Sequence, residues 1–438
     1  MVTMHFARSS FIGIFALALA SSVLADDEPK VPLPAIPGRE FDIRSFGAVE
    51  GRDHLNTDAV ASAIKAATSA GGGVVVIPKG TFLCGKIVLA SKIELRLESG
   101  STLLMTDSAD AYRNSRGGFD DLISASKSSD VAITGSGTID GQGQRWWDDF
   151  RKVKGTREQD ALENHRPHLI DFKNCTRIRF EGITLVNSPS FHLVPKSCQD
   201  VTIRGVTFNA PDSAPNTDAL DPSGWNYLIT NCVFDVGDDC IAVKATGPSS
   251  PLRLACEDFY ISKCTFLHGH GLSIGGQTPG GLRRMVVRDC TFDSTEAGIR
   301  MKANRGSGGV VEDVTYDGLT MKNVKIPIYI TSYYPQPPKD PAKDPPQAAN
   351  EKTPVWRNIT IRNVRAIGSR EVGRIIGLPE MRIGPIKFFN VQITAEKPLV
   401  LIWATDLSFN SSRIASKVKP SISSAESTYT GLESSIGK

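Results

Sequence analysis

The chain has 438 residues, with 50 Lys and Arg against 47 Asp and Glu, a formal net charge of +3, and 40% hydrophobic residues. This nearly balanced charge indicates no overall attraction to nucleic acid or to an anionic membrane surface. Beyond the first 25 residues, no run approaches the eighteen or more apolar residues that a membrane span requires.

The first 25 residues read as a secretory signal peptide. Arg8 precedes the apolar run from Phe11 to Leu24, and a small-residue cleavage site ends at Ala25. Removal of residues 1–25 leaves 49 basic and 47 acidic residues, a net charge of +2. We therefore expect a secreted or periplasmic protein that starts with a linker over residues 26–39.

A short helix is expected ahead of the main repeats. Residues 59–67 are rich in Ala and contain Ile64, and Asn56, Thr57 and Asp58 just before them have the chemistry of a helix N-cap. A stack of repeats that is left open exposes its core and its strand edges. We expect this helix to plug the N-terminal end of the stack.

Short blocks of apolar and β-branched residues, bounded by Gly, Asn and Asp, recur through the middle of the chain. Aligned on one another, they form two columns of side chains two residues apart, which lie on one face of a strand. Successive members of the first column are separated by 23 to 45 residues, so the strand is kept while the loops grow. The first column is Ile183, Val206, Cys232, Cys264, Cys290, Leu319, Val364 and Val391, and the second is Leu185, Phe208, Phe234, Phe266, Phe292, Met321, Ala366 and Ile393.

These columns predict an all-β fold, a single-stranded parallel β-helix over residues 40–408, with coils stacked at about 4.8 Å. Leucine-rich and helical repeats fit poorly, because the blocks are short and lack ten-residue amphipathic stretches. The chain becomes Ser-rich and polar near its end, so residues 409–438 are expected to form a loose tail.

Eight cysteines in an exported protein suggest disulfides, but a chain of this size does not need them as its main source of stability. Cys232, Cys264 and Cys290 belong to the first column, which favours an interior stack of small apolar side chains. Neighbouring coils would also allow a disulfide there. The sequence does not reveal how the other five pair: Cys84, Cys175, Cys198, Cys240 and Cys256.

Titratable residues gather at one place in the repeat. When the coils are aligned on apolar positions, Asp218, Asp239 and His270 take the same position on three consecutive coils. On the next coil Arg300 and Lys302 flank Met301, so an interior Met301 would direct both cations outward on one face. The aligned apolar residues are Leu220, Ile241, Leu272 and Ile299.

Asp238 stands directly beside Asp239, between apolar runs. Adjacent carboxylates repel each other's ionised form and can hold one proton near neutrality, as general acid catalysis requires. Each polar residue has an ordinary structural explanation by itself, such as a turn cap or charge neutralisation. Their coincidence in one register on consecutive coils indicates a site.

Four motifs resemble, in this order, the signatures of the polygalacturonases of glycoside hydrolase family 28. The resemblance extends over residues 40–405 and includes the stretch from Gly137 to Trp147 that often precedes the first full coils in such proteins. It implies a right-handed parallel β-helix. The motifs are Asn216-Thr-Asp218, Gly237-Asp-Asp239, Gly269-His270-Gly271 and Arg300-Met-Lys302.

The resemblance also implies a role for each residue. Asp238 would be the general acid that protonates the glycosidic oxygen, and Asp218 with Asp239 would hold and activate the attacking water. His270 would tune the protonation of the acid. Substrate would be bound by Asn216, by Arg300 and Lys302, which would take the galacturonate carboxylate, and by Tyr334, with Tyr333 as the alternative. No metal or cofactor is implied.

Inverting hydrolysis requires carboxyl groups roughly 6.5–9.5 Å apart, a gap that stacked coils can supply. A polyanionic substrate accounts for a local basic pair on a nearly neutral chain. We therefore expect a secreted, metal-independent glycoside hydrolase that cleaves α-1,4-galacturonosyl linkages of pectin. We expect it to be a monomer with no nucleic-acid or membrane partner.

Ala219, Met301 and Ala303 stand where the family usually has Gly, Ile and Thr, which leaves the chemistry intact. The loop from Asp239 to His270 and the loop from Pro335 to Pro354 would rim the cleft, which favours release of terminal units over internal cleavage. Rhamnogalacturonan and xylogalacturonan stay open as substrates. So do two other functions on the same fold: a calcium-dependent pectate lyase, and a carbohydrate-binding or adhesin protein without catalysis.

Overall fold

The computed structural model of the chain describes residues 28–156, 166–247 and 253–432. The chain divides into two units, residues 1–30 and 31–438, and the second carries the fold. The predicted signal peptide lies outside the described residues, and the part of the predicted linker from 28 to 39 contains no helix or strand. None of the helices in the described ranges is both long enough and apolar enough to span a membrane.

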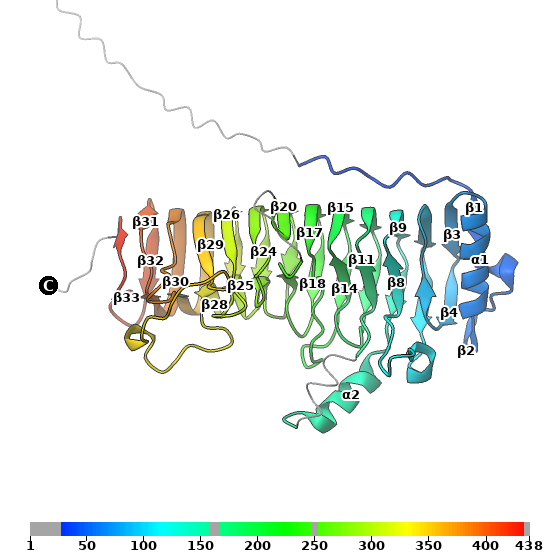
Figure 1. Cartoon of the computed structure of the whole chain (residues 1–438), viewed down its shortest axis with the longest axis horizontal. Coiled ribbons are helices and arrows are strands. Elements are labelled where there is room, and N and C mark those ends of the chain that lie inside the picture. The colour runs from blue at the N-terminus through cyan, green and yellow to red at the C-terminus, as the bar shows by residue number, and fades with distance from the viewer. Residues whose placement is uncertain (1–27, 157–165, 248–252, 433–438) are drawn as a thin grey trace, which may run out of the picture. The chain divides into compact units, whose positions relative to one another are not determined.

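The second unit is the predicted parallel β-helix, in which each turn of the chain adds strands to three ladders (Figure 1). All pairings between successive coils in the ladders are parallel. The first ladder contains β1 (Glu40–Asp42), β3 (Gly73–Ile77), β6 (Ile93–Leu97), β9 (Ser129–Gly135), β12 (Thr176–Glu181), β15 (Cys198–Arg204), β17 (Gly224–Thr230), β20 (Cys256–Ser262), β23 (Leu282–Arg288), β26 (Val310–Asp317), the starts of β29 (Val355–Ile376) and β30 (Ile386–Ile402), β31 (Leu407–Asn410) and β34 (Tyr429–Thr430).

The second ladder follows the first around each coil. It contains β2 (Gly51–Leu55), β4 (Gly80–Cys84), β7 (Ser101–Met105), β10 (Thr138–Asp140), β13 (Thr184–Val186), β16 (Thr207–Asn209), β18 (Val233–Asp235), β21 (Thr265–Phe266), β24 (Thr291–Asp293), β27 (Thr320–Lys322), the middle parts of β29 and β30, and β32 (Arg413–Ser416).

The third ladder positions the candidate site. It contains β5 (Ile87–Val88), β8 (Ile123–Ser126), β11 (Ile170–Lys173), β14 (Leu193–Lys196), an isolated bridge at Leu220, β19 (Ile241–Val243), β22 (Leu272–Gly275), β25 (Ala297–Lys302), β28 (Ile326–Thr331), the ends of β29 and β30, and β33 (Ile422–Ala425).

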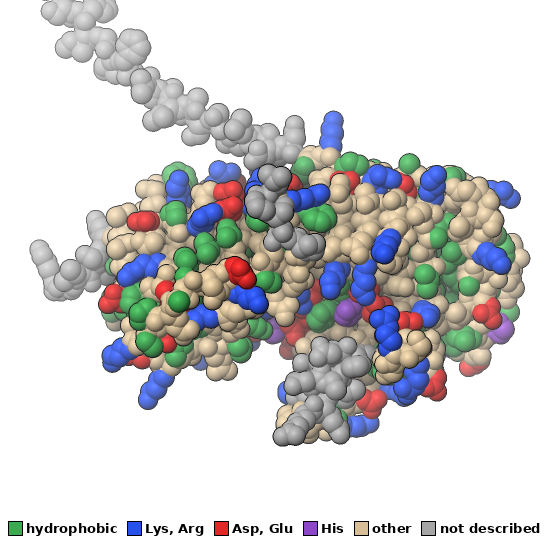
Figure 2. Space-filling view, in the orientation of Figure 1, with side chains coloured by type: hydrophobic (Ala, Val, Ile, Leu, Met, Phe, Trp, Pro, Cys, Tyr) green, Lys and Arg blue, Asp and Glu red, His purple; other side chains and the backbone are tan. Residues whose placement is uncertain are grey.

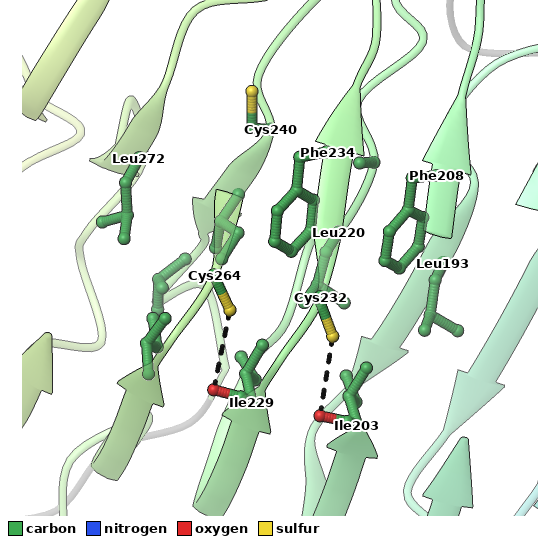
Figure 3. Close-up of a cluster of buried hydrophobic side chains, with 14 of the residues drawn as sticks. Leu193, Ile203, Phe208, Leu220, Ile229, Cys232, Phe234, Cys240, Cys264 and Leu272 are labelled. Carbon is green, nitrogen blue, oxygen red and sulfur yellow. Dashed lines mark hydrogen bonds between the residues drawn. The ribbon is translucent and has the colours of Figure 1, made fainter. Parts of the chain in front are cut away.

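All sixteen side chains of the two predicted columns are buried. The second column is confirmed as a ladder, because its residues pair in the predicted register through the whole series. The first column differs from the prediction: except for Val364 and Val391, its residues lie just before the strands of the second ladder and not within them. Phe208, Phe234, Phe266 and Phe292 stack face to face, with successive ring centroids 5.1, 4.9 and 4.3 Å apart. Figure 3 shows part of this stack beside Leu193, Leu220 and Leu272 of the third ladder.

The eight cysteines all lie in the described part of the chain, where they are buried and free. In the stacked column, Cys232 Sγ donates to the carbonyl oxygen of Ile203 at 3.7 Å, and Cys264 Sγ to that of Ile229 at 3.9 Å (Figure 3). These thiols therefore fill the interior as small apolar side chains, which is the interpretation that the sequence favours.

Helix α1 (Thr57–Ser69) lies across the N-terminal end of the stack, as predicted (Figure 1). It buries Ala59, Val60, Ala63, Ile64 and Ala67 against the first coils. The expected side-chain cap does not form: Asn56 Oδ1 instead accepts from the backbone N–H of Val49 at 2.7 Å, and its Nδ2 donates to backbone carbonyls. The buried amide ties the helix start to the preceding strand.

The prediction of a loose tail is wrong for the described residues beyond 409. There β32, β33 and β34 add one more partial coil on β30 and β31, and Ile414, Ile422 and Tyr429 pack on the core. A terminal coil has a neighbour on one side only, so it needs few apolar residues and looks polar in sequence. Residues 433–438 lie outside the described ranges.

Two segments project from the same side of the solenoid in Figure 1. One contains α2 (Gln144–Val153), which buries Trp146, Trp147 and Phe150. The other is the Pro-rich loop over residues 335–354, which contains the short 3₁₀ helix η3 (Pro341–Lys343). Two further 3₁₀ helices, η1 (Ile43–Phe46) and η2 (Ala109–Tyr112), lie near the N-terminal coils.

Candidate active site

The predicted alignment of polar residues is confirmed by the third ladder. Leu220 bridges to Ile241, Ile241 pairs with Leu272, and Leu272 pairs with Ile299. Asp218, Asp239 and His270 each stand two residues before one of these apolar positions. They open onto a cavity of about 460 Å³ that is lined by all eight predicted site residues.

Asp239 is buried beneath the predicted basic pair. Met301 is fully buried, and its neighbours Arg300 and Lys302 both turn to the same face, as predicted. Arg300 Nη1 lies 2.6 Å from Asp239 Oδ1 and Lys302 Nζ lies 2.7 Å from Oδ2. Burial alone would raise the pKa of Asp239, but Lys302, His270 and Arg300 together lower it well below its usual range. Asp239 is therefore an ionised carboxylate.

Asp238 contacts His270, which also lies 3.7 Å from Asp239 Oδ1. Asp238 Oδ1 lies 3.0 Å from His270 Nδ1 and accepts the backbone N–H of Asp239 at 2.9 Å. The other ring nitrogen of His270, Nε2, lies 3.2 Å from Glu296 Oε2. Burial opposes protonation of His270, but hydrogen bonds to Asp238 and Asp239 raise its pKa to about 10. Asp238 thus contacts a protonated imidazole ring.

This arrangement predicts a pH-dependent contribution of His270 to stability. Because its folded-state pKa is raised above the ordinary value of about 6.5, the contribution is fully present below pH 6.5 and is lost as the pH rises toward 10. We expect urea unfolding of His270→Gln to differ most from the wild type at pH 5–6. The difference should shrink by pH 10, and a difference that is constant over this range would contradict the assignment.

Asp218 shares a cation with a second buried carboxylate, Asp221. Lys244 Nζ lies 3.5 Å from Asp218 Oδ2 and forms a shorter ion pair with Asp221 Oδ2. Burial and the charges of Asp221 and Asp238 raise the pKa of Asp218 well above its usual range. The two carboxylates predicted to activate water, Asp218 and Asp239, are therefore held in opposite electrostatic environments.

Asn216 is held by Arg166, a residue that no sequence pattern singles out. Arg166 donates to Asn216 Oδ1 and to the carbonyl oxygens of Pro189 and Pro215 at 3.1 and 3.0 Å. The Arg166 guanidinium also lies 4.3 Å from the ring centroid of Phe150, in α2. Arg166 therefore links the projecting helix to the wall of the cavity.

The structure places Tyr334, rather than Tyr333, at the cavity. The ring centroid of Tyr334 lies 5.0 Å from Lys302 Nζ. Tyr333 is buried, and its hydroxyl donates to Asp344 of the Pro-rich loop at 2.8 Å. Asp344 also pairs with Arg305 at 2.7 Å, so this loop is tied to the solenoid directly behind Tyr334.

The sequence patterns did not identify several residues that line the cavity, among them Phe191, Lys244 and Gln277. A signal existed for Phe191, which stands two residues before Leu193, the strand position paired with Leu220. Extended by two further coils, the same register reaches His168, whose ring stacks on Phe191 with centroids 5.0 Å apart, and Asp121. The row of residues that stand two positions before the buried strand residues therefore starts at Asp121, three coils before Asp218.

Within the described ranges, two clusters have the composition of a metal site, and neither arrangement favours a resident ion. In the first, Asp238, Asp239 and His270, the Asp239 carboxylate already pairs with Arg300 and Lys302. In the second, Asp121, His168 and Asp171, Lys173 Nζ lies 3.7 Å from Asp121 and 3.3 Å from Asp171. In both clusters, lysine or arginine side chains already neutralise the carboxylates that would bind a metal ion.

The surface charge agrees with the balanced composition. On the face drawn in Figure 2, outside the grey segments, Lys and Arg side chains are scattered among acidic ones without an extended patch of one sign. Anion recognition by the described residues therefore rests on local groups such as Arg300 and Lys302.

Comparison with known proteins identifies the family. The family "Glycosyl hydrolases family 28" matches residues 69–397. The chain is 30% identical to an endo-polygalacturonase of Pectobacterium carotovorum over 88% of this chain and 93% of that protein, and 31% identical to a probable polygalacturonase of Vitis vinifera over 80% and 73%. The structure resembles that of an exopolygalacturonase from Thermotoga maritima with a TM-score of 0.74 at 26% identity, over 92% of this chain and 94% of the other. The chain is therefore a member of glycosyl hydrolase family 28, with the right-handed parallel β-helix of its polygalacturonases.

Proposed function

We propose that this family 28 glycoside hydrolase cleaves α-1,4-galacturonosyl linkages of pectin with inversion and without a metal ion. The observation that carries the proposal is that three carboxylates with different partners line one cavity: Asp238 beside His270, Asp239 beside Arg300 and Lys302, and Asp218 beside Lys244. An acid and an ionised carboxylate, Asp239, then face the same space, as direct displacement by water requires. The polygalacturonase names of the relatives support the choice of substrate.

In this mechanism Asp238 protonates the glycosidic oxygen as the bond to the anomeric carbon breaks. His270 contacts Asp238 at 3.0 Å and positions this acid, while Lys302 and Arg300 help to keep Asp239 ionised. Asp218 and Asp239 orient a water on the opposite side of the sugar and take up its proton as it attacks.

The substrate side of the proposal rests on Arg300 and Lys302. One carboxylate, Asp239, faces both cations, so the pair retains positive charge for a sugar carboxylate beside the scissile bond. Tyr334 lies over Lys302, and Asn216 is fixed by Arg166, so both can position the sugar ring. We also infer from the signal-peptide pattern that the protein acts outside the cytoplasm, as a monomer.

Product analysis tests this function. We expect hydrolysis of polygalacturonate to new reducing ends, with no activity on rhamnogalacturonan. Monomer alone would indicate release of terminal units, and a ladder of oligomers would indicate internal cleavage. Cleavage of neither polymer would overturn the choice of substrate.

Chelation separates the hydrolase from the lyase alternative. We expect full activity in EDTA, because Asp239 is neutralised by Arg300 and Lys302 instead of a metal ion. No ultraviolet absorbance from an unsaturated product should appear. Loss of activity in EDTA that calcium restores, together with such absorbance, would favour a lyase.

A further inference from the structure

Lys244 lies between the two buried carboxylates on the N-terminal side of the cavity. It directly follows β19 and approaches Asp218 and Asp221, which flank the bridge residue Leu220. Its Nζ also lies 4.1 Å from the ring centroid of Phe191. Lys244 thus divides its positive charge between two carboxylates of the protein, with the shorter contact to Asp221.

With Asp221, which is buried beside the cavity, four aspartates gather around Lys244, against three other cations, Arg300, Lys302 and His270. Asp239 pairs with Arg300 and Lys302, and Asp238 pairs with His270. Asp218 and Asp221 both form their ion pairs with Lys244. In addition, Asp221 Oδ1 is buried without a hydrogen-bond partner among the described residues, so its charge depends on Lys244.

The groups that face Asp218 come from several coils. Asp221 belongs to the same turn, Asp238 and Asp239 precede β19, and Lys244 follows it. From the preceding coil, the His192 N–H donates to the Asp218 carbonyl at 2.8 Å, and its Nδ1 lies 3.1 Å from that oxygen. Burial lowers the pKa of His192 to about 4, so His192 is neutral. Of these groups, Lys244 supplies the positive charge.

We propose that Lys244 is a positioning residue whose charge opposes protonation of Asp218 and keeps its carboxyl group turned toward the attacking water, without binding the sugar itself. The inference rests on the proposed function, because it assumes that Asp218 takes up a proton from water. Phe191 supports the arrangement: it covers Lys244 on one side and stacks on His168 on the other. The ring thereby separates Lys244 from the neighbouring cluster of Asp121 and Asp171.

The test is the pH profile of polygalacturonate hydrolysis. In Lys244→Met, loss of the positive charge should raise the pKa of Asp218, so the acid limb of kcat/KM should move to higher pH by about one pH unit or more. At pH values on that limb, kcat should fall about tenfold for each pH unit that the limb moves, while KM changes little. Adding Asp221→Asn to Lys244→Met removes a like charge and should move the limb back toward the wild-type position.

The chain offers a matched control in Lys173→Met. Lys173 takes the same place after Ile170 as Lys244 takes after Ile241, and it pairs with Asp121 and Asp171 away from the cavity. Its substitution should leave the acid limb in place. Thermal unfolding of each variant shows whether it is folded.

Two results would overturn the proposal. A raised KM with an unmoved limb would mean that Lys244 binds the sugar carboxylate. A uniform loss of rate at all pH values, not recovered by adding Asp221→Asn, would mean a structural role only. If the wild type itself is inactive on galacturonans, the proposed function fails, and ¹³C NMR titration of Asp218 in wild type and Lys244→Met still decides the charge assignment: equal pKa values would refute it.

Discussion

Asp238→Asn is expected to reduce kcat on polygalacturonate about 10³-fold while the protein stays folded. The amide has nearly the shape of the carboxyl group but cannot protonate the glycosidic oxygen. It can still meet His270, whose Nδ1 lies 3.0 Å from the present Asp238 Oδ1. Initial rates of reducing-end release, with circular dichroism as the check on folding, measure the effect.

Asp235→Asn is the matched control for this variant. Asp235 ends β18, three residues before Asp238, and pairs with His268 outside the cavity. We expect wild-type rates from it. The outcome that contradicts hydrolysis has two parts. The wild type would show no turnover, and Asp238→Asn would bind saccharide and produce the biological effect as the wild type does. The protein would then be a carbohydrate binder instead of a hydrolase.

Lys302→Met should affect stability and activity together. The side chains of Lys302 and Asp239 are 5% and 4% exposed, so removal of the cation leaves a buried carboxylate that has lost one of its three cationic partners and keeps Arg300 and His270. Losing one partner of a buried pair typically costs about 3 kcal/mol or more. We expect urea unfolding to show a loss of this size, and kcat/KM to fall about 100-fold because the sugar carboxylate also loses its cation.

The double variant Lys302→Met with Asp239→Asn isolates the effect on stability. Neutralising Asp239 removes the uncompensated buried charge, so stability should largely return, whereas activity should stay low because Asp239 itself is proposed to activate water. Lys322→Met, an exposed lysine 3.9 Å from Asp293, serves as the control with neither effect. An unchanged KM in Lys302→Met alone would show that Lys302 only neutralises Asp239 and does not contact substrate.

The fold could be predicted because the interior of a β-helix repeats the same strand face on every coil. Leu185, Phe208 and Phe234 keep their alignment whatever the length of the loops between them. Register also predicted the candidate site. Asp218 and Asp239 each precede a buried residue by two positions, and these buried residues, Leu220 and Ile241, pair across neighbouring coils.

The parts that sequence reasoning missed depend on contacts outside this register. Arg166 donates a hydrogen bond to Asn216 from a segment 50 residues away, and no local sequence pattern predicts this contact. Lys244 is an isolated lysine after a strand, and its importance appears only once Asp221 is seen to be buried beside it. At the C-terminus, Ile414 and Tyr429 are too sparse to reveal strands that only one neighbouring coil supports.

The anchored Pro-rich loop has a further consequence for how the enzyme can be changed. Asp344 is held by Arg305 and Tyr333, which follow strands β25 and β28, and Trp403 Nε1 donates to the Pro341 carbonyl at 2.8 Å. The loop is therefore attached at two separate points. Shortening it outside these attachments should leave the spacing of Asp218 and Asp239 unchanged, because the pairing of the coils sets that spacing.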